Sequence, residues 1–400
     1  MKNFTLILAA LFTLTANAAP VGAAYQVYRM GSSGTIPAFG AIDLSQSAAV
    51  TGVLKPANGG YIGQNLVING MFDFWQRGSS LSSGTGSRYL ADRWRNTSVG
   101  STNTVSRGVF TVGQTDVPGE PRYYHSMTVS TVAGASNYAG FQHFVEDVRT
   151  CAGQVCTLQF WAKADGNKNI SIFPQQGFGT GGSPSSGVSL TPQMVSLTTQ
   201  WQKFNLTFNV PSISGKTFGT TNYTSYLSFF FWIDCGSSLA SQCNSIGQQS
   251  GTFDLANVSL VKGYNGPDSF VRAGGDLAGE LSKVQRYYEK SYEIETDPAS
   301  STTEGLEYSA CRYASATTID HCSRITFKVP KRIASTALGC SLWNDSGTAN
   351  QWKNQGNTSL ATSIDTKNIR GFNITSTADS GKTIEQGAGW YGHWACDADF

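Results

Sequence analysis

The side chains best suited to bind a ligand lie close together near the end of the sequence. Two tryptophans, a tyrosine and a histidine fall within one short stretch there, and two further tryptophans precede it. Flat aromatic rings stack on the apolar faces of pyranose sugars, while polar side chains meet the hydroxyl groups in the plane of the ring. We therefore predict that this group contacts a glycan, its members being Trp343, Trp352, Trp390, Tyr391, His393 and Trp394.

A strand through this stretch would divide its side chains between two faces. Trp390 and Trp394 would share one face, and Tyr391 and His393 the other. The alternative to sugar binding is that one set belongs to a hydrophobic core while the other packs between protomers. His393 is expected to pack or to form hydrogen bonds rather than to bind a metal.

Motifs for catalysis and cofactor binding are missing from the sequence. The glycines of a G-x-G-x-x-G pattern, Gly177, Gly179 and Gly182, run into Ser183 and a proline, with no helix to present its N-terminus to a phosphate. Patterns of serine hydrolases, zinc peptidases, P-loops and EF-hands do not occur. Nothing in the spacing of the 26 acidic residues nominates the carboxylate pair of a glycosidase. We expect no enzyme and no cofactor.

Metal binding is not predicted either. The four histidines are scattered and no C-x-x-C pair occurs, which argues against a structural zinc ion. Asp73 and Asp254 could help to hold a calcium ion, but a plain surface or turn position is the favoured interpretation of both residues.

The first residues indicate export from the cytoplasm. Met1 and Lys2 precede an apolar run over residues 4–14, which is too short to span a bilayer, and the small residues Ala16 and Ala18 suit cleavage. We predict a signal peptide over residues 1–18, with a retained membrane anchor as the alternative. No later segment is expected to span a membrane.

Export would allow the eight cysteines to form disulfides. Proximity in the sequence favours three short-range pairs and leaves one long-range pair in the C-terminal region. The predicted disulfides are Cys151–Cys156, Cys235–Cys243, Cys311–Cys322 and Cys340–Cys396.

The composition favours an extracellular all-β protein with a large core. Charged residues make up only 14% of the 400 residues, whereas aromatic residues reach 12% and glycines number 44. That many rings argue against simple disorder. The 28 basic and 26 acidic residues nearly balance, so the sequence carries no electrostatic footprint for nucleic acid or for an anionic membrane.

Hydrophobic periodicity predicts short strands separated by glycine-rich turns, which is typical of a β-sandwich. A continuous apolar run at residues 226–233 predicts a central strand covered on both faces, and a change of phase within residues 253–260 predicts a bulge. Alternating runs predict further strands at residues 157–163, 203–210, 324–329 and 369–374.

One helix is expected, over residues 276–292. Asp276 can cap it, and Leu277, Leu281, Val284 and Tyr288 recur at helical spacing. The apolar spacing would also suit a coiled-coil seam, but the segment is too short to hold a coiled coil by itself. We interpret it as a connector that packs against its neighbours.

Residues 20–64 are rich in glycine, alanine and serine and lack apolar periodicity, so they cannot build a core alone. They would become ordered if several chains wrapped together, as in a trimeric stem. The expected organisation is a signal peptide (1–18), a stem or linker (19–64), a jelly-roll sandwich (65–264), a linker with a helix (265–292) and a C-terminal β tip domain (293–400).

Several strings resemble phage tail-fibre and appendage proteins. Residues 49–60 read AVTGVLKPANGG, as where a thin trimeric stem meets a globular domain. Carbohydrate-binding-module-like jelly rolls of such proteins have similar openings and closing strands. The matching strings here are NLVINGMFDFWQRG (65–78), YLADRW (89–94) and FDLANVSLVKG (253–263). ELSKVQRYYEK (280–290) and FKVPKR (327–332) are similar to the helix and distal domain that follow.

Two features depart from phage fibres, which assemble in the host cytoplasm: the signal peptide and the distal cysteines. In its signal peptide the chain is similar to exported trimeric fibre adhesins of predatory bacteria, and the distal cysteines are natural in an exported fibre. The resemblance covers residues 49–335 and no part of the tip beyond, so it implies no ligand there. Within the resembling strings, Trp75 and Trp94 are expected in the core. Trp161 lies opposite the aliphatic face of its strand and is expected to be exposed or to meet another subunit.

The sequence thus predicts a cell-surface homotrimeric fibre adhesin that recognises glycans or envelope polymers of another cell through its tip. Three weak sugar sites would gain avidity from trimerisation. Two alternatives remain open. One is a secreted polysaccharide-degrading enzyme or its binding subunit, and the other is a structural surface fibre without a ligand.

Overall fold

The computed structural model describes residues 27–29, 38–40, 64–263, 269–310, 320–333, 337–376 and 389–400. The chain divides into two compact units, Met1–Gly60 and Tyr61–Phe400. In the first unit, strand β1 (Val27–Arg29) pairs antiparallel with β2 (Ala38–Gly40). The predicted signal peptide and most of the predicted stem lie outside the described residues.

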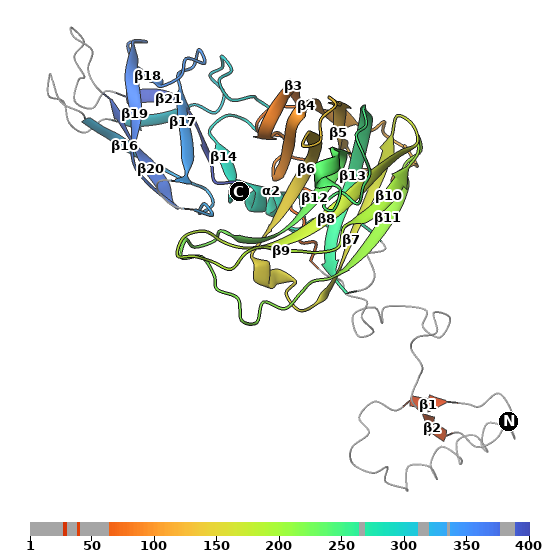
Figure 1. The fold of residues 1–400 in the computed structure, drawn as a ribbon. Helices are drawn as coiled ribbons and strands as arrows, with labels where there is room; N and C mark the ends of the chain where they lie inside the picture. The colour runs from red at the N-terminus through yellow and green to blue at the C-terminus, as the bar shows by residue number, and fades with distance from the viewer. Residues whose placement is uncertain are drawn as a thin grey trace, which may run out of the picture. The chain divides into compact units, whose positions relative to one another are not determined.

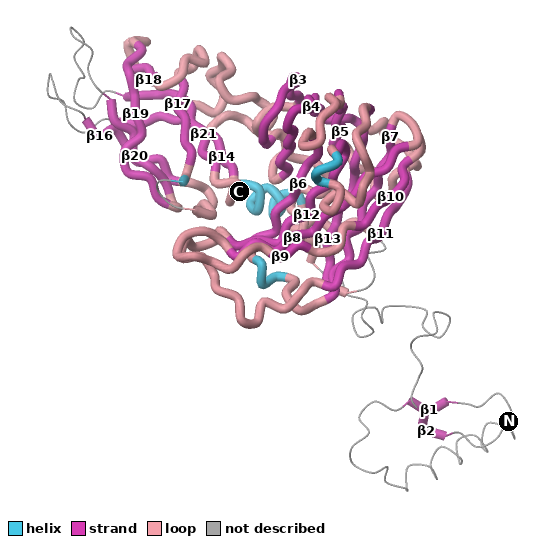
Figure 2. The backbone as a smooth tube through the Cα atoms, in the orientation of Figure 1, coloured by secondary structure: helices cyan, strands magenta, loops and turns pink. Residues whose placement is uncertain are grey.

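The second unit is almost entirely β-structure, built on two antiparallel sheets (Figures 1 and 2). The larger sheet has 11 strands. In chain order they are β3 (Ser80–Tyr89), β4 (Trp94–Val109), β5 (Tyr123–Ser130), β6 (Tyr138–Glu146), β7 (Val155–Ala164), β8 (Lys168–Phe178), β9 (Val188–Ser189), β10 (Gln193–Leu197), β11 (Gln202–Asn209), β12 (Ser225–Cys235) and β13 (Gly251–Lys262). Short 3-10 turns, η2 (Val148–Thr150) and η3 (Ser237–Leu239), lie in its loops.

The larger sheet folds over on itself at β4 to make a jelly-roll sandwich. The first half of β4 pairs with β6, and the second half pairs with β5. The order β10-β8-β12-β6-β4 therefore forms one layer, and β4-β5-β13-β7-β11 forms the other. Gly100 lies at the crossing with a φ of 70°, and a Cβ there would collide with the Asn137 side chain. Only glycine meets both demands at this bend.

The predicted strands are confirmed in the sandwich. The runs at 157–163 and 203–210 coincide with β7 and β11, and the continuous run at 226–233 lies within β12, between β6 and β8. β13 shifts register between Ala256 and Ser259, as the change of phase predicts. Trp75 and Trp94 are buried in the core between the layers, whereas Trp161 is half-buried.

The helix α2 (Leu277–Gln285) is shorter than predicted. Asp276 caps it as expected, its Oδ1 accepting a hydrogen bond from the Gly279 N–H at 2.7 Å. The helix ends at Gln285, however, and Tyr288 lies in strand β14 (Tyr288–Lys290). Leu277, predicted on the apolar face, is 53% exposed. Pairing of β14 with the second sheet outweighs the local helical spacing.

The second sheet has eight strands and its own core. After β14 come β15 (Glu307–Ala310), β16 (Asp320–Thr326), β17 (Gly339–Trp343), β18 (Gln351–Asn354), β19 (Ser359–Asn368), β20 (Gly371–Ser376) and β21 (Gly389–Asp397). β21 is its hub, because β14, β15, β17 and β18 all pair with it. β16 stops at Thr326 and β20 begins at Gly371, so the strands expected at 324–329 and 369–374 are only partly correct.

Three of the four predicted disulfides are confirmed. They are Cys151–Cys156, Cys235–Cys243 and Cys340–Cys396. The fourth predicted pair, Cys311–Cys322, lies outside the side chains that the structure describes. Within the described ranges, no helix has the length and apolar character needed to cross a bilayer.

Candidate functional site

Four of the six side chains predicted to contact a glycan are buried, which corrects that prediction. Trp352, Trp390 and Trp394 are 0%, 1% and 3% exposed and belong to the core of the second sheet. His393 points to the other side of β21, as predicted, but is also 0% exposed. Side chains without access to solvent cannot stack on a sugar.

His393 is covered by the chain segment that follows β14. Its ring stacks on Tyr292 with centroids 3.8 Å apart. Its Nε2 lies 3.0 Å from the Thr302 carbonyl, and its Nδ1 lies 3.2 Å from the Ser291 hydroxyl. Burial lowers the pKa of His393. The expected hydrogen-bonding and packing role is therefore confirmed.

Only Tyr391 and Trp343 of the predicted group keep partial exposure. Tyr391 lies opposite Tyr308 in the β15–β21 pair, with ring centroids 5.7 Å apart, and Tyr308 is 71% exposed. The Tyr391 hydroxyl donates to Asn357 Oδ1 at 3.3 Å. This leaves a tyrosine pair on the second sheet in place of a six-residue aromatic site.

The aspartates considered for calcium are both engaged by cations. Arg272 binds Asp73 at 2.9 Å, and Lys163 lies 3.6 Å from Asp254. Among the residues that the structure describes, no group of three histidine, cysteine or acidic side chains clusters as metal ligands do.

The sandwich carries a recess of about 490 Å³ on the outer face of the β10-β8-β12-β6-β4 layer. Strands β8 and β9 and the start of the turn into β10 provide one part of its lining, and the loop after β12 provides the rest. The lining residues are Phe173, Gln175, Ser189, Leu190, Thr191, Ser241 and Gln242.

Strand alternation and a disulfide position this lining. Along β8, Ile170 and Ile172 point into the core of the sandwich, so Phe173 and Gln175 point outward. The loop that carries Ser241 and Gln242 is closed at its base by the Cys235–Cys243 disulfide.

A small apolar cluster lies beneath that loop. Leu239 and Ile246 pack against buried Phe173, Phe230 and Trp232. The backbone of the loop is anchored as well, by Ser238 N–H donating to the Ala135 carbonyl at 2.9 Å. The loop that forms this wall of the recess is therefore held by a disulfide, an apolar cluster and a backbone hydrogen bond.

The chemistry of the recess is polar but uncharged. It presents the amides of Gln175 and Gln242 and the hydroxyls of Ser189, Thr191 and Ser241, whereas Phe173 is only 9% exposed. Such a lining suits a neutral ligand with many hydroxyl groups. Sequence reasoning missed this site, although the outward alternation at Phe173 and Gln175 and the short Cys235–Cys243 loop were visible signals.

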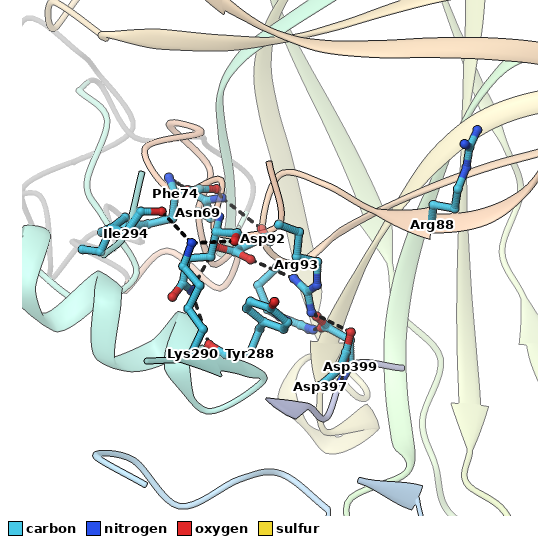
Figure 3. A network of polar contacts seen from close by, with 12 residues as sticks. Asn69, Phe74, Arg88, Asp92, Arg93, Tyr288, Lys290, Ile294, Asp397 and Asp399 are labelled. Atoms are coloured by element: carbon cyan, nitrogen blue, oxygen red, sulfur yellow. Dashed lines mark hydrogen bonds and ion pairs between the residues drawn. The ribbon is translucent and has the colours of Figure 1, made fainter. Parts of the chain in front are cut away.

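A buried ionic network joins the sandwich to the segment after β21 (Figure 3). Arg77 binds Asp92 at 2.7 Å, Asp399 at 2.6 Å and Asp397 at 3.0 Å. Arg93, which is fully buried, also binds Asp399. Burial alone would lower the pKa of Arg77, but the three carboxylates outweigh burial and raise it. The network joins residues of the sandwich to the segment after β21.

Lys290 completes the junction from β14. Its ammonium group donates to the carbonyls of Gln76, Ile294 and Thr296 at 2.8, 3.0 and 2.5 Å. Burial lowers the pKa of Lys290 to about 8. Because its hydrogen-bonding capacity is filled by carbonyls, we assign it a structural role.

Comparison with known proteins gives similarity to solved structures. No protein-family model and no curated protein matches the sequence. A CBM4 structure is 15% identical, with 49% of this chain and 99% of that chain covered and a TM-score of 0.28. The enzymatically active domain of bacteriophage CBA120 tailspike protein 4 is 15% identical, with 50% and 21% covered and a TM-score of 0.29. The family 11 carbohydrate-binding module from Clostridium thermocellum, in complex with a β-1,3-1,4-mixed-linked tetrasaccharide, is 14% identical, with 46% and 99% covered and a TM-score of 0.27.

Proposed function

We propose that the protein binds glycans through the recess of its sandwich. The observation that carries this proposal is the lining itself, in which two amides and three hydroxyls converge without a charged side chain. A sugar matches this pattern because its hydroxyl groups can exchange hydrogen bonds with the amides and hydroxyls. Binding without catalysis is part of the proposal.

A glycan array probed with the full chain tests the proposal. The variants Gln175→Ala and Gln242→Ala remove amides from the recess, and the double variant should bind the best array glycan about tenfold more weakly. Asn205→Ala is the matched control, because it removes an exposed amide from β11 in the opposite layer. Equal binding by the double variant and the wild type would place the sugar elsewhere.

We also propose that the chain is an exported, surface-displayed homotrimeric fibre adhesin. The predicted signal peptide and the coreless segment at residues 20–64 support export and trimerisation. The three disulfides are compatible with an oxidising compartment. Light scattering on the full mature chain measures the oligomer directly, and a stable monomer would reject the trimeric version.

The same purified protein can be used to distinguish the two alternative functions. New reducing ends after incubation with envelope polysaccharides would favour a degrading enzyme. Absence of binding to every array glycan at avid concentrations would favour a structural fibre.

A further inference from the structure

Three aromatic rings gather on the outer face of the β4-β5-β13-β7-β11 layer, on the opposite side of the sandwich from the recess. Tyr124 lies in β5, Phe110 follows β4, and Trp201 immediately precedes β11. The ring centroids are 4.9 Å apart for Phe110 and Tyr124, 5.3 Å for Phe110 and Trp201, and 5.4 Å for Tyr124 and Trp201. Each residue is half-buried, so these three rings, called here the outer aromatic cluster, remain in contact with solvent.

Strand alternation and one glycine place Tyr124 on this face. Its neighbours in β5, Tyr123 and His125, are buried on the core side. Across the strand pair, Tyr124 lies opposite Gly108, where a Cβ would lie only 2.1 Å from the tyrosine ring. Glycine weakens a strand and often marks a close approach. Here it leaves room for the Tyr124 ring to lie against the sheet.

Polar side chains border the outer aromatic cluster. The Lys163 ammonium group lies 5.2 Å from the Trp201 ring centroid and 3.6 Å from Asp254 Oδ2. Strand pairing places Asp254 between Lys163 and Ser126, and it places Ser126 opposite Ser106. A second row of paired residues runs beside the first and consists of Thr104, Thr128 and Thr252. Every residue in the two rows is half-buried or exposed, so their polar groups face solvent beside the rings.

We propose that the outer aromatic cluster and the two polar rows form a second glycan-binding surface, which takes an extended neutral polysaccharide. A ring of the cluster stacks on the apolar face of one pyranose, and the serine and threonine hydroxyls exchange hydrogen bonds with the hydroxyl groups of the following units. The ligand is neutral because the charges of Lys163 and Asp254 offset each other.

The shape of this surface favours the flank of a chain over its end. The first row crosses β4, β5, β13 and β7, which are neighbours in the sheet. Three strand spacings give it a length of about 14 Å. This inference goes beyond the recess and does not depend on it, because no residue is shared between the two sites.

The test measures binding of the full chain to the polysaccharides of a glycan array. Trp201→Ala removes one ring and should weaken polysaccharide binding about threefold to tenfold. Phe218→Ala is the matched control, because it removes a half-buried ring that contacts Phe178 and Arg149 instead, and it should bind like the wild type. If Trp201→Ala does not fold, Trp201→Leu replaces it, because leucine fills space without a flat ring.

A second measurement locates the polysaccharide on the protein. Oxidation of tryptophan by N-bromosuccinimide, followed by peptide mass spectrometry, should be slower at Trp201 when the array polysaccharide that binds best is present. Trp343 is the internal control, because it is half-buried in the second sheet, and its oxidation should not change.

The possible results separate this inference from the proposed function. Equal polysaccharide binding by Trp201→Ala and Phe218→Ala, or unchanged oxidation of Trp201, would overturn this inference alone. Weaker binding in Trp201→Ala, together with unchanged binding in the double variant of Gln175 and Gln242, would support this inference and overturn the recess. A lower mass of Trp201→Ala than of the wild type in light scattering would assign the rings to a contact between protomers, which also overturns the inference.

Discussion

Acid should destabilise the sandwich through a buried histidine. His125 is 0% exposed and lies among aromatic rings, with the Phe141 centroid 4.8 Å away. Its Nε2 lies 2.8 Å from Asn96 Oδ1, while its Nδ1 has no hydrogen-bond partner in the part of the chain that the structure describes. Burial lowers the pKa of His125 from 6.5 to about 3. A proton on Nδ1 would therefore be a buried charge without a counter-ion.

The direction and the size of the change in the free energy of unfolding follow from proton linkage. The unfolded chain binds a proton as the pH falls below 6.5, whereas the folded chain resists protonation until about pH 3, so stability is lost across that window. At about pH 5.5, where most carboxylates are still ionised, His125 alone should cost about 1.4 kcal/mol of the free energy of unfolding. His143 is also buried and has its pKa lowered, so it adds to the same decline.

Denaturant unfolding at about pH 7.5 and about pH 5.5 measures the effect. The variant His125→Gln keeps a donor toward Asn96 but does not titrate. Its loss of stability between the two pH values should be about 1.4 kcal/mol smaller than that of the wild type. An equal loss in both proteins would show that His125 is protonated in the folded state, and the reasoning from its burial would then be wrong.

Two further changes test the packing of the second sheet and its junction. Asp399→Asn removes the charge that faces buried Arg93 and should lower the free energy of unfolding by about 3 kcal/mol, measured with denaturant. The control Glu295→Gln removes an exposed partner of a surface ion pair and should lower it by less than about 1 kcal/mol. Gly392→Ala would place a Cβ 2.4 Å from the buried Trp352 ring and should lower the free energy of unfolding by about 1–3 kcal/mol. The measurement is the midpoint of thermal unfolding, which should fall. An unchanged midpoint would mean that the ring moves aside freely.

Local patterns predicted much of the fold because they report directly on strand periodicity and chain proximity. The period of two in residues 203–210 reflects the half-buried β11, and the short spacing of Cys235 and Cys243 reflects a loop that must close on itself. The start of α2 after its cap, Asp276, was also predictable from local sequence, because an N-cap depends on only a few residues.

Burial in the second sheet could not be predicted in the same way. The alternation of Trp390 and His393 was correct, but which face is covered depends on distant segments. Trp390 is buried by a core drawn from several strands, and His393 is covered by Tyr292, which lies about a hundred residues earlier in the chain. The recess was missed for a related reason, since Gln175 and Gln242 meet only through the folded loop after β12.

The central place of β21 in the second sheet has a consequence for biogenesis. Because β14, β15, β17 and β18 all hydrogen-bond to Gly389–Asp397, none of these pairings can form before that stretch has been synthesised. Tyr288, for example, pairs with Asp397, so β14 stays unpaired until nearly all of the second sheet has been synthesised. Pairing between strands that are distant in the sequence is slow, and it leaves strand edges unpaired while the chain is being synthesised. The second sheet can therefore be completed only after its last strand has been synthesised.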